Sequence, residues 1–177
     1  MNEQRNVGPG RAIVVMGVSG CGKSSVGASL ALRLGTPFLE GDSLHPPANV
    51  EKMAKGIPLT DDDRFPWLEL IGARLAEALA RGQSIVVSCS ALRKSYRDIL
   101  RRAGNGQTAF VFLEGTPELL AQRMGAREGH FMPTSLLTSQ LQTLESPSGE
   151  AGVVTVSIDQ DLEAIVDDAL SGLSKIR

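Results

Sequence analysis

The sequence has few of the residues on which several classes of protein depend. Among its 177 residues are only two cysteines, Cys21 and Cys89, and they do not form a CxxC pair. Two thiols cannot build a metal cluster by themselves, and free thiols in a reducing compartment are favoured over a disulfide. We therefore expect neither a disulfide scaffold nor a cysteine-based metal centre.

An excess of one charge and long apolar runs are also missing. Lys and Arg number 18 against 20 Asp and Glu, which gives a formal net charge of -2 and no electrostatic footprint for nucleic acid or an anionic membrane. No apolar run approaches the ~20 residues of a membrane span. Residues 1–10 are polar, unlike a signal peptide, and are expected to form a flexible tail. The sequence therefore predicts a cytoplasmic protein whose partners are small molecules.

The chain is expected to fold as one α/β domain over residues 11–177, because its length and 42% hydrophobic content suit a single core. Short apolar runs alternate with helical patterns, which is typical of a parallel sheet with helices on both faces. Strands are predicted at Ala12–Met16, Pro37–Glu40, Ser84–Ser88, Thr108–Leu113 and Val153–Ile158. Helices are predicted at Cys21–Leu34, Pro46–Ala54, Asp63–Arg81, Ala91–Arg102, Pro117–Gly125, Pro133–Leu144 and Asp159–Ser174.

The residues from Gly17 to Ser24 fit the phosphate-binding loop pattern of Gly, four residues, then Gly-Lys-Ser. A buried strand precedes the loop and a helix follows it, so backbone N–H groups would point into one concavity at a helix N-terminus. Lys23 is expected to reach the β- and γ-phosphates of ATP, and Ser24 to ligate Mg²⁺. The expected ATP contacts within the loop are Gly17, Val18, Ser19, Gly20, Cys21, Gly22, Lys23, Ser24 and Ser25.

Two carboxylates, Glu40 and Asp42, follow the second predicted strand. Ligands of such sheets bind beyond the carboxyl ends of the strands, where the phosphate loop also opens. One carboxylate could hold Mg²⁺ through water while the other accepts the proton of an attacking hydroxyl. A solvated strand end with a helix N-cap is an equally good interpretation of the spacing.

Three acids, Asp61 to Asp63, precede Arg64, and the only Trp follows at position 67. A charged helix start explains the acids, because carboxylates favour the first turn. Arg64 has a second interpretation, since a guanidinium beside a kinase cleft can bind a carboxylate through two hydrogen bonds.

The third predicted strand ends in small residues, Ser88 to Ser90, with no Asp of the Walker B type. Small hydroxyl residues leave room for a second substrate, with Arg93 opening the next helix. Ser90 could also serve as a helix cap, and the two roles are compatible.

Arg123 and Arg127 are four residues apart and share a face if the helix continues through Gly125. Both could point at phosphates from a mobile lid over residues 122–135, which also contains His130. Paired arginines are common on ordinary surface helices as well.

Together these segments resemble the gluconate kinases, small P-loop kinases related to shikimate and nucleoside monophosphate kinases. The resemblance covers roughly residues 12–158 in family order. The motifs most specific to this family are Pro58-Leu-Thr-Asp-Asp-Asp-Arg64 and His130-Phe-Met-Pro133, whereas the phosphate loop is shared by many NTPases. Other matching positions are Glu40 to His45, Asn49, Lys52, Met53, Ser88 to Leu92, Tyr96, Arg97, Asp98, Leu136, Leu137, Ser139, Gln140, Leu144 and Glu145.

The resemblance implies transfer of the γ-phosphoryl group of ATP to the 6-hydroxyl of D-gluconate, on a five-stranded parallel sheet and commonly in a homodimer. On this basis Lys23, Asp42 and Arg127 are expected to be catalytic: Lys23 at the phosphates, Asp42 as the base and Arg127 at the transferring group. Mg²⁺ would be bound by Ser24 and, through water, Glu40. Arg123 is expected nearer adenine and the phosphates. The expected gluconate contacts are Asp42, His45, Arg64, Ser90, Arg93 and His130.

Three other functions compete with this one. Another small-molecule kinase on the same scaffold could act on shikimate or a nucleotide. A GTP-dependent switch would need a DxxG stretch and an NKxD guanine reader, and neither is present. A regulatory homologue without activity is disfavoured because Lys23, Ser24, Asp42 and both lid arginines are retained.

Overall fold

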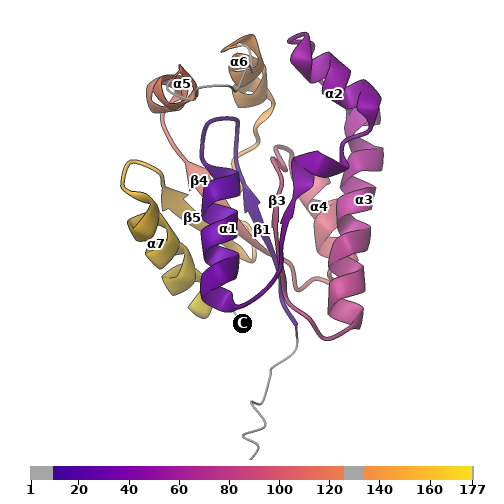
Figure 1. The fold of residues 1–177 in the computed structure, drawn as a ribbon, viewed down its shortest axis with the longest axis vertical. Coiled ribbons are helices and arrows are strands. Elements are labelled where there is room, and N and C mark those ends of the chain that lie inside the picture. The colour runs from indigo at the N-terminus through magenta and orange to yellow at the C-terminus, as the bar shows by residue number, and fades with distance from the viewer. Residues whose placement is uncertain (1–9, 126–133, 177) are drawn as a thin grey trace, which may run out of the picture.

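Five parallel strands form the centre of the molecule, in a computed structural model that describes residues 10–125 and 134–176 (Figure 1). Their order across the sheet is β2-β3-β1-β4-β5. The strands are β1 (Ala12–Met16), β2 (Phe38–Glu40), β3 (Ile85–Ser88), β4 (Ala109–Glu114) and β5 (Val153–Ser157). The predicted sheet is thereby confirmed.

Helices cover both faces of this sheet, as predicted (Figure 1). Helices α1 (Lys23–Leu34) and α7 (Leu162–Ser174) pack together on one face, and α3 (Asp61–Ala80) and α4 (Lys94–Ala103) on the other. Helices α2 (Pro47–Ala54), α5 (Pro117–Gly125) and α6 (Thr134–Thr143) lie toward the edge where the strands end. None of the described helices is both long and apolar enough to cross a membrane.

The central strands were predictable because both of their faces are buried. Every residue of β1 is buried, and β1 pairs with β3 on one side and β4 on the other. A strand in that position must be apolar at successive residues, which is the pattern that the sequence displays. The core therefore follows the sheet and its two helical layers.

Several helix starts differ from the predicted ones, for local reasons. Helix α3 begins at Asp61 rather than Asp63, because Thr60 and Asp63 form a capping box. Helix α4 begins at Lys94 rather than Ala91, because Ala91 has a φ of 46° and cannot belong to a right-handed helix. A short 3₁₀ helix, η1 (Gly41–Leu44), follows β2 and was not predicted.

Gly41 joins β2 to η1 at a point where no side chain fits. Its N–H donates to Ser88 Oγ at 3.2 Å, and its carbonyl accepts from Trp67 Nε1 at 2.8 Å. A Cβ atom at this position would collide with the backbone oxygen of Ser88. The glycine therefore lets the ends of β2 and β3 approach each other closely.

We predict that Gly41→Ala lowers the free energy of unfolding by about 1–3 kcal/mol, because overpacking forces the backbone of β2 away from β3. Urea unfolding followed by circular dichroism measures the change. Gly125→Ala is the matched control, since a Cβ there meets nothing within 4 Å. Equal stability losses in the two variants would contradict the proposed steric cause.

Candidate active site

The loop over residues 17–22 connects β1 to α1 and has the shape of a phosphate cradle. Its last residue, Gly22, caps α1 with a φ of 91°, a left-handed conformation that favours glycine. Lys23 begins the helix, and its Nζ donates to the carbonyl of Val18 at 3.2 Å, so the ammonium group lies against the loop. A helix N-terminus, a nearby cation and a turn of backbone amides together suit a polyphosphate.

A pocket opens beside this loop and brings together residues from six different segments. Six of its lining residues were predicted from the sequence as functional: Ser19, Lys23, Asp42, His45, Arg64 and Ser90. The others are Met53, Pro58, Leu59, Trp67, Leu92, Leu136, Ser139 and Gln140. The pocket therefore combines two cations and a carboxylate with several hydrogen-bonding groups.

The two carboxylates at the carboxyl end of β2 have different surroundings. Glu40 is half-buried and accepts a hydrogen bond from Ser88 Oγ at 2.6 Å. Asp42 lies in η1 with its side chain 58% exposed, and it lines the pocket. Asp42 is therefore the carboxylate that a ligand in the pocket could contact directly.

His45 is buried against the same pocket. Its ring stacks on Trp67 with centroids 3.9 Å apart, and its Nδ1 lies 3.2 Å from Asn49 Nδ2. Because an amide nitrogen can only donate, Nδ1 accepts, which leaves Nε2–H facing Asp42 Oδ1 at 3.7 Å. Burial lowers the pKa of His45 below its ordinary value against the opposing effect of Asp42, while the charge of Arg64 lowers it further. His45 is therefore a neutral donor beside Asp42.

Arg64 is a buried cation in the wall of the pocket. Its guanidinium donates to Tyr96 Oη at 3.0 Å, and Tyr96 in turn donates to Asp61 Oδ1. Among the described residues, no carboxylate forms a salt bridge with Arg64; Asp61 pairs instead with Arg93 at 3.8 Å. A buried guanidinium held by a neutral hydroxyl can still bind an anionic ligand.

A second hollow lies on the other side of the phosphate loop. It is lined by Gly20, Cys21, Gly22, Ser25, Val26, Arg123, Gln160, Asp161, Leu162 and Ile165. Arg123, on α5, donates to the carbonyl of Ile158 just after β5. The loop thus separates two hollows, one beside Asp42 and Arg64 and one beside Arg123.

Comparison with known proteins decides the family. A family model described as "AAA domain" matches residues 13–147. A gluconokinase of Gluconobacter oxydans is 49% identical over 90% of this chain and 89% of its own length. The thermoresistant gluconokinase of Escherichia coli is 46% identical over 92% of this chain and 93% of its own. The chain belongs to the gluconokinase family.

A solved structure agrees with this assignment. The crystal structure of a gluconokinase from Sinorhizobium meliloti 1021 is 59% identical, with a TM-score of 0.86 over 94% of this chain and 93% of that one. These comparisons confirm the resemblance to the gluconate kinases and the predicted P-loop kinase fold.

Several other predicted residues of this gluconokinase-family chain are described by the structure and do not line the pocket beside Asp42. Ser24 and Ser25 are exposed on the first turn of α1, and the side chain of Cys21 is buried in the loop. Arg93 is exposed at the N-cap of α4 and does not contribute to the pocket lining. Arg127 and His130 lie outside the described residues.

Two residues with clear contacts in this gluconokinase-family site had no role assigned from the sequence. Gln140, on α6, accepts from the Ser19 backbone N–H at 2.8 Å and so connects α6 to the phosphate loop. Tyr96 orients Arg64 from α4. Both stand in blocks that match the gluconate kinases, but neither has a spacing that predicts a contact.

The oxygen donors of this gluconokinase-family chain suit a magnesium ion. In the part of the chain that the structure describes, no three His, Cys, Asp or Glu side chains gather as a metal site. Mg²⁺ does not need such a cluster, because it keeps several waters and binds one or two carboxylates plus phosphates. The Ser24 hydroxyl and the Glu40 carboxylate are donors of that kind.

We predict that His45 makes the folded protein less stable at acid pH. Its pKa is lower in the folded state than its ordinary value of 6.5, so the unfolded chain binds the additional proton first. The free energy of unfolding should therefore fall as the pH drops below about 6.5. Urea unfolding at about pH 8 and about pH 5.5 measures this change, which should be smaller in His45→Gln. A fall of the same size in that variant would exclude His45 as the cause.

Proposed function

We propose that the protein transfers the γ-phosphoryl group of ATP to the 6-hydroxyl of D-gluconate. The observation that carries this proposal is one pocket containing the loop lysine, an accessible carboxylate and a buried guanidinium: Lys23, Asp42 and Arg64. The family relationship supports gluconate as the acceptor. Shikimate or a nucleotide as acceptor and a switch or regulatory role are less well supported, because the relatives are gluconokinases.

Arg64 would bind the carboxylate of gluconate. The ligand is an anion that carries a chain of hydroxyls, so it needs a cation at one end and several hydrogen-bonding groups along its length. Burial of Arg64 to 8% exposure strengthens its interaction with an anion, and Tyr96 holds the guanidinium in place. His45 and Ser90 line the same pocket and would bind hydroxyls.

Asp42 would orient the 6-hydroxyl and accept its proton. Its carboxylate lines the pocket, and the neutral ring of His45, which lines the same pocket, directs its Nε2–H toward that carboxylate. Phosphoryl transfer has a loose transition state, so we expect positioning and charge neutralisation to supply most of the catalysis.

The two hollows on either side of the loop support a path for ATP across it. The adenine of ATP would lie in the hollow beside Arg123, and the γ-phosphate would lie beside Lys23 at the edge of the acceptor pocket. Ser24 and, through water, Glu40 would hold Mg²⁺, which when bound neutralises charge on the phosphates. Ser88, which donates to Glu40, would keep that carboxylate in position.

Further parts of the proposal depend on the sequence resemblance. Arg127 would contact the transferring group, and Arg93 and His130 would make weaker contacts with gluconate. A mobile lid over residues 122–135 would exclude water. A homodimer is proposed from the resemblance, and a cytoplasmic location also suits the two buried, free cysteines.

An assay of ADP formation with and without D-gluconate, in the presence of ATP and Mg²⁺, tests the function directly. The wild type should form ADP only when gluconate is present. Asp42→Asn should reduce kcat by ~10²-fold or more while ATP binding survives, because the amide cannot accept the hydroxyl proton.

Asp62→Asn is the matched control for the base, since Asp62 is an exposed carboxylate outside the pocket lining. It should retain the kcat of the wild type. A wild type that ignores gluconate would overturn the proposed function, and a fully active Asp42→Asn would overturn the assignment of the base.

To test whether Arg64 binds the carboxylate of gluconate, we predict that Arg64→Met raises the KM for gluconate by about 10- to 100-fold. This rise is equivalent to the loss of one charge-assisted contact. The KM for ATP should change far less, because the loop amides and Lys23 are untouched. Steady-state kinetics with each substrate varied in turn measures both values. Arg93→Ala is the control, since it removes a guanidinium outside the pocket lining, and it should raise the KM for gluconate by a smaller factor. Equal effects of Arg64→Met on the KM of both substrates would contradict the binding of gluconate by Arg64.

A further inference from the structure

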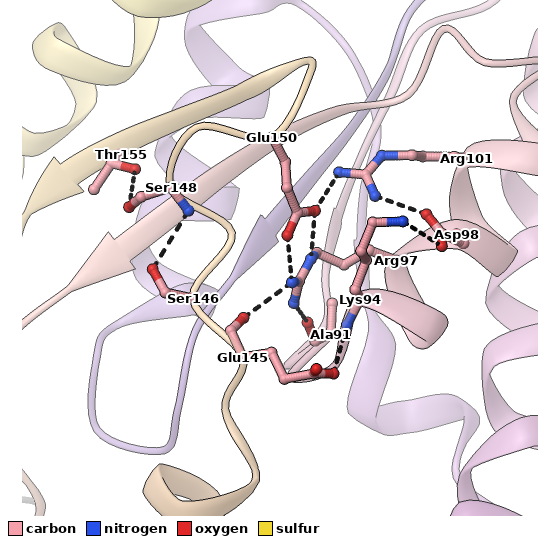
Figure 2. A network of polar contacts seen from close by, with 10 residues as sticks. All are labelled: Ala91, Lys94, Arg97, Asp98, Arg101, Glu145, Ser146, Ser148, Glu150 and Thr155. Carbon is pink, nitrogen blue, oxygen red and sulfur yellow. Dashed lines mark hydrogen bonds and ion pairs between the residues drawn. The ribbon is translucent and has the colours of Figure 1, made fainter.

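Arg97, on α4, is a completely buried arginine to which the proposed chemistry assigns no role. Its guanidinium spreads its hydrogen bonds over two separate segments, as Figure 2 shows. Nη1 donates to the carbonyl of Ala91 at 2.8 Å, and Nη2 donates to the carbonyl of Glu145 at 2.9 Å. Nε and Nη2 also bind the two carboxylate oxygens of Glu150 at 3.1 and 2.7 Å. One side chain thus joins the segment after β3 to the segment after α6.

The first segment, residues 89–93, forms one wall of the acceptor pocket through Ser90 and Leu92. Its carbonyls are held in sequence: Ser90 by the N–H of Gly17 at 3.4 Å, Ala91 by Arg97, and Leu92 by the N–H of Glu145 at 2.7 Å. Ala91 is buried with a φ of 46°, which is unfavourable for a residue with a Cβ. Such a conformation persists only where its surroundings hold it in place.

The second segment, residues 144–152, connects α6 to β5. Glu145 contacts the first segment through its N–H, which donates to the carbonyl of Leu92. Its other two polar groups contact α4: the carbonyl accepts from Arg97, and the carboxylate accepts from the Lys94 N–H at 3.1 Å. Glu150 also binds Arg101 at 2.7 Å, and Arg101 in turn binds Asp98 (Figure 2). Hydrogen bonds from Arg97 and Arg101 hold the pKa of Glu150 below its ordinary value despite partial burial. The carboxylate therefore remains ionised where it binds both arginines.

Helix α6, which ends where the second segment begins, forms another wall of the pocket through Leu136 and Gln140. Both walls are thus tied to Arg97, one through Ala91 and the other through Glu145 and Glu150. We propose that Arg97 is a positioning residue for the phosphoryl acceptor, because it fixes the Ser90–Leu92 wall of the pocket relative to the C-terminal end of α6. This inference rests on the proposed function for its substrate, and on the described contacts for its geometry.

The proposal requires the forked shape of arginine. A guanidinium donates hydrogen bonds in several fixed directions at once. The ammonium group of lysine has the same charge but cannot form the same set of hydrogen bonds. Arg97→Lys therefore keeps a cation for Glu150 and weakens the hold on the Ala91 and Glu145 carbonyls. We expect the KM for gluconate to rise about tenfold, since small misplacements of a binding wall are costly. The KM for ATP should stay within about twofold of the wild type.

Arg101→Lys is the matched control, because Arg101 also binds Glu150 but does not contact the Ala91 or Glu145 carbonyl. Both of its KM values should resemble those of the wild type. Glu150→Gln provides a second variant if Arg97→Lys does not fold, and it should raise the KM for gluconate in the same selective way. A loss of stability alone would lower the active fraction and leave both KM values unchanged.

Hydrogen exchange of the backbone amides of residues 89–93, followed by mass spectrometry without substrate, provides a readout independent of activity. Exchange should be faster in Arg97→Lys than in Arg101→Lys. Equal exchange in the two variants, or an unchanged KM for gluconate in both Arg97→Lys and Glu150→Gln, would overturn the positioning role. Failure of the wild type to phosphorylate gluconate would overturn the proposed function, while the exchange experiment would still decide whether Arg97 holds this wall.

Discussion

The hydrogen bonds of Ser88 at the end of β3 are the constraint on which the candidate site depends. The hydroxyl donates to the Glu40 carboxylate and accepts the N–H of Gly41, so it ties the end of β2 to the end of β3. Strand β3 pairs in turn with β1, which leads into the phosphate loop. The separation between the phosphate cradle and the acidic residues at the end of β2 is therefore determined by backbone pairing and one buried hydroxyl, rather than by flexible side chains.

Two buried arginines show how the same side chain can serve ligand binding or architecture. Arg64 donates to the neutral hydroxyl of Tyr96, so its charge remains available to an anion in the pocket. Arg97 binds the carboxylate of Glu150, and its charge is neutralised within the protein. Buried charges are tolerated only when they are paired or hydrogen-bonded. Across the described residues, no buried side-chain nitrogen or oxygen lacks a hydrogen-bond partner.

The sequence predicted the sheet well because buried parallel strands and glycine-rich turns have strong local patterns. It was less accurate where contacts between distant segments determine an element's end. Helix α4 starts only at Lys94, because Ala91 is held in a left-handed conformation by groups that include Arg97, six residues away. The carbonyl of Leu92 is bound by the N–H of Glu145, which is more than fifty positions further along the chain. No periodicity within the segment itself indicates such a bond.

The sequence by itself determined the alternation of strands and helices, the phosphate loop and the family to which the chain belongs, because each of these is encoded in residues that are close together along the chain. Only the tertiary structure decided which of the predicted polar residues share a pocket, that Arg93 stands outside it, and that Arg97, Tyr96 and Gln140 support it. Those relationships arise where strand ends and helices from separate parts of the chain converge, and backbone pairing across the sheet brings them there.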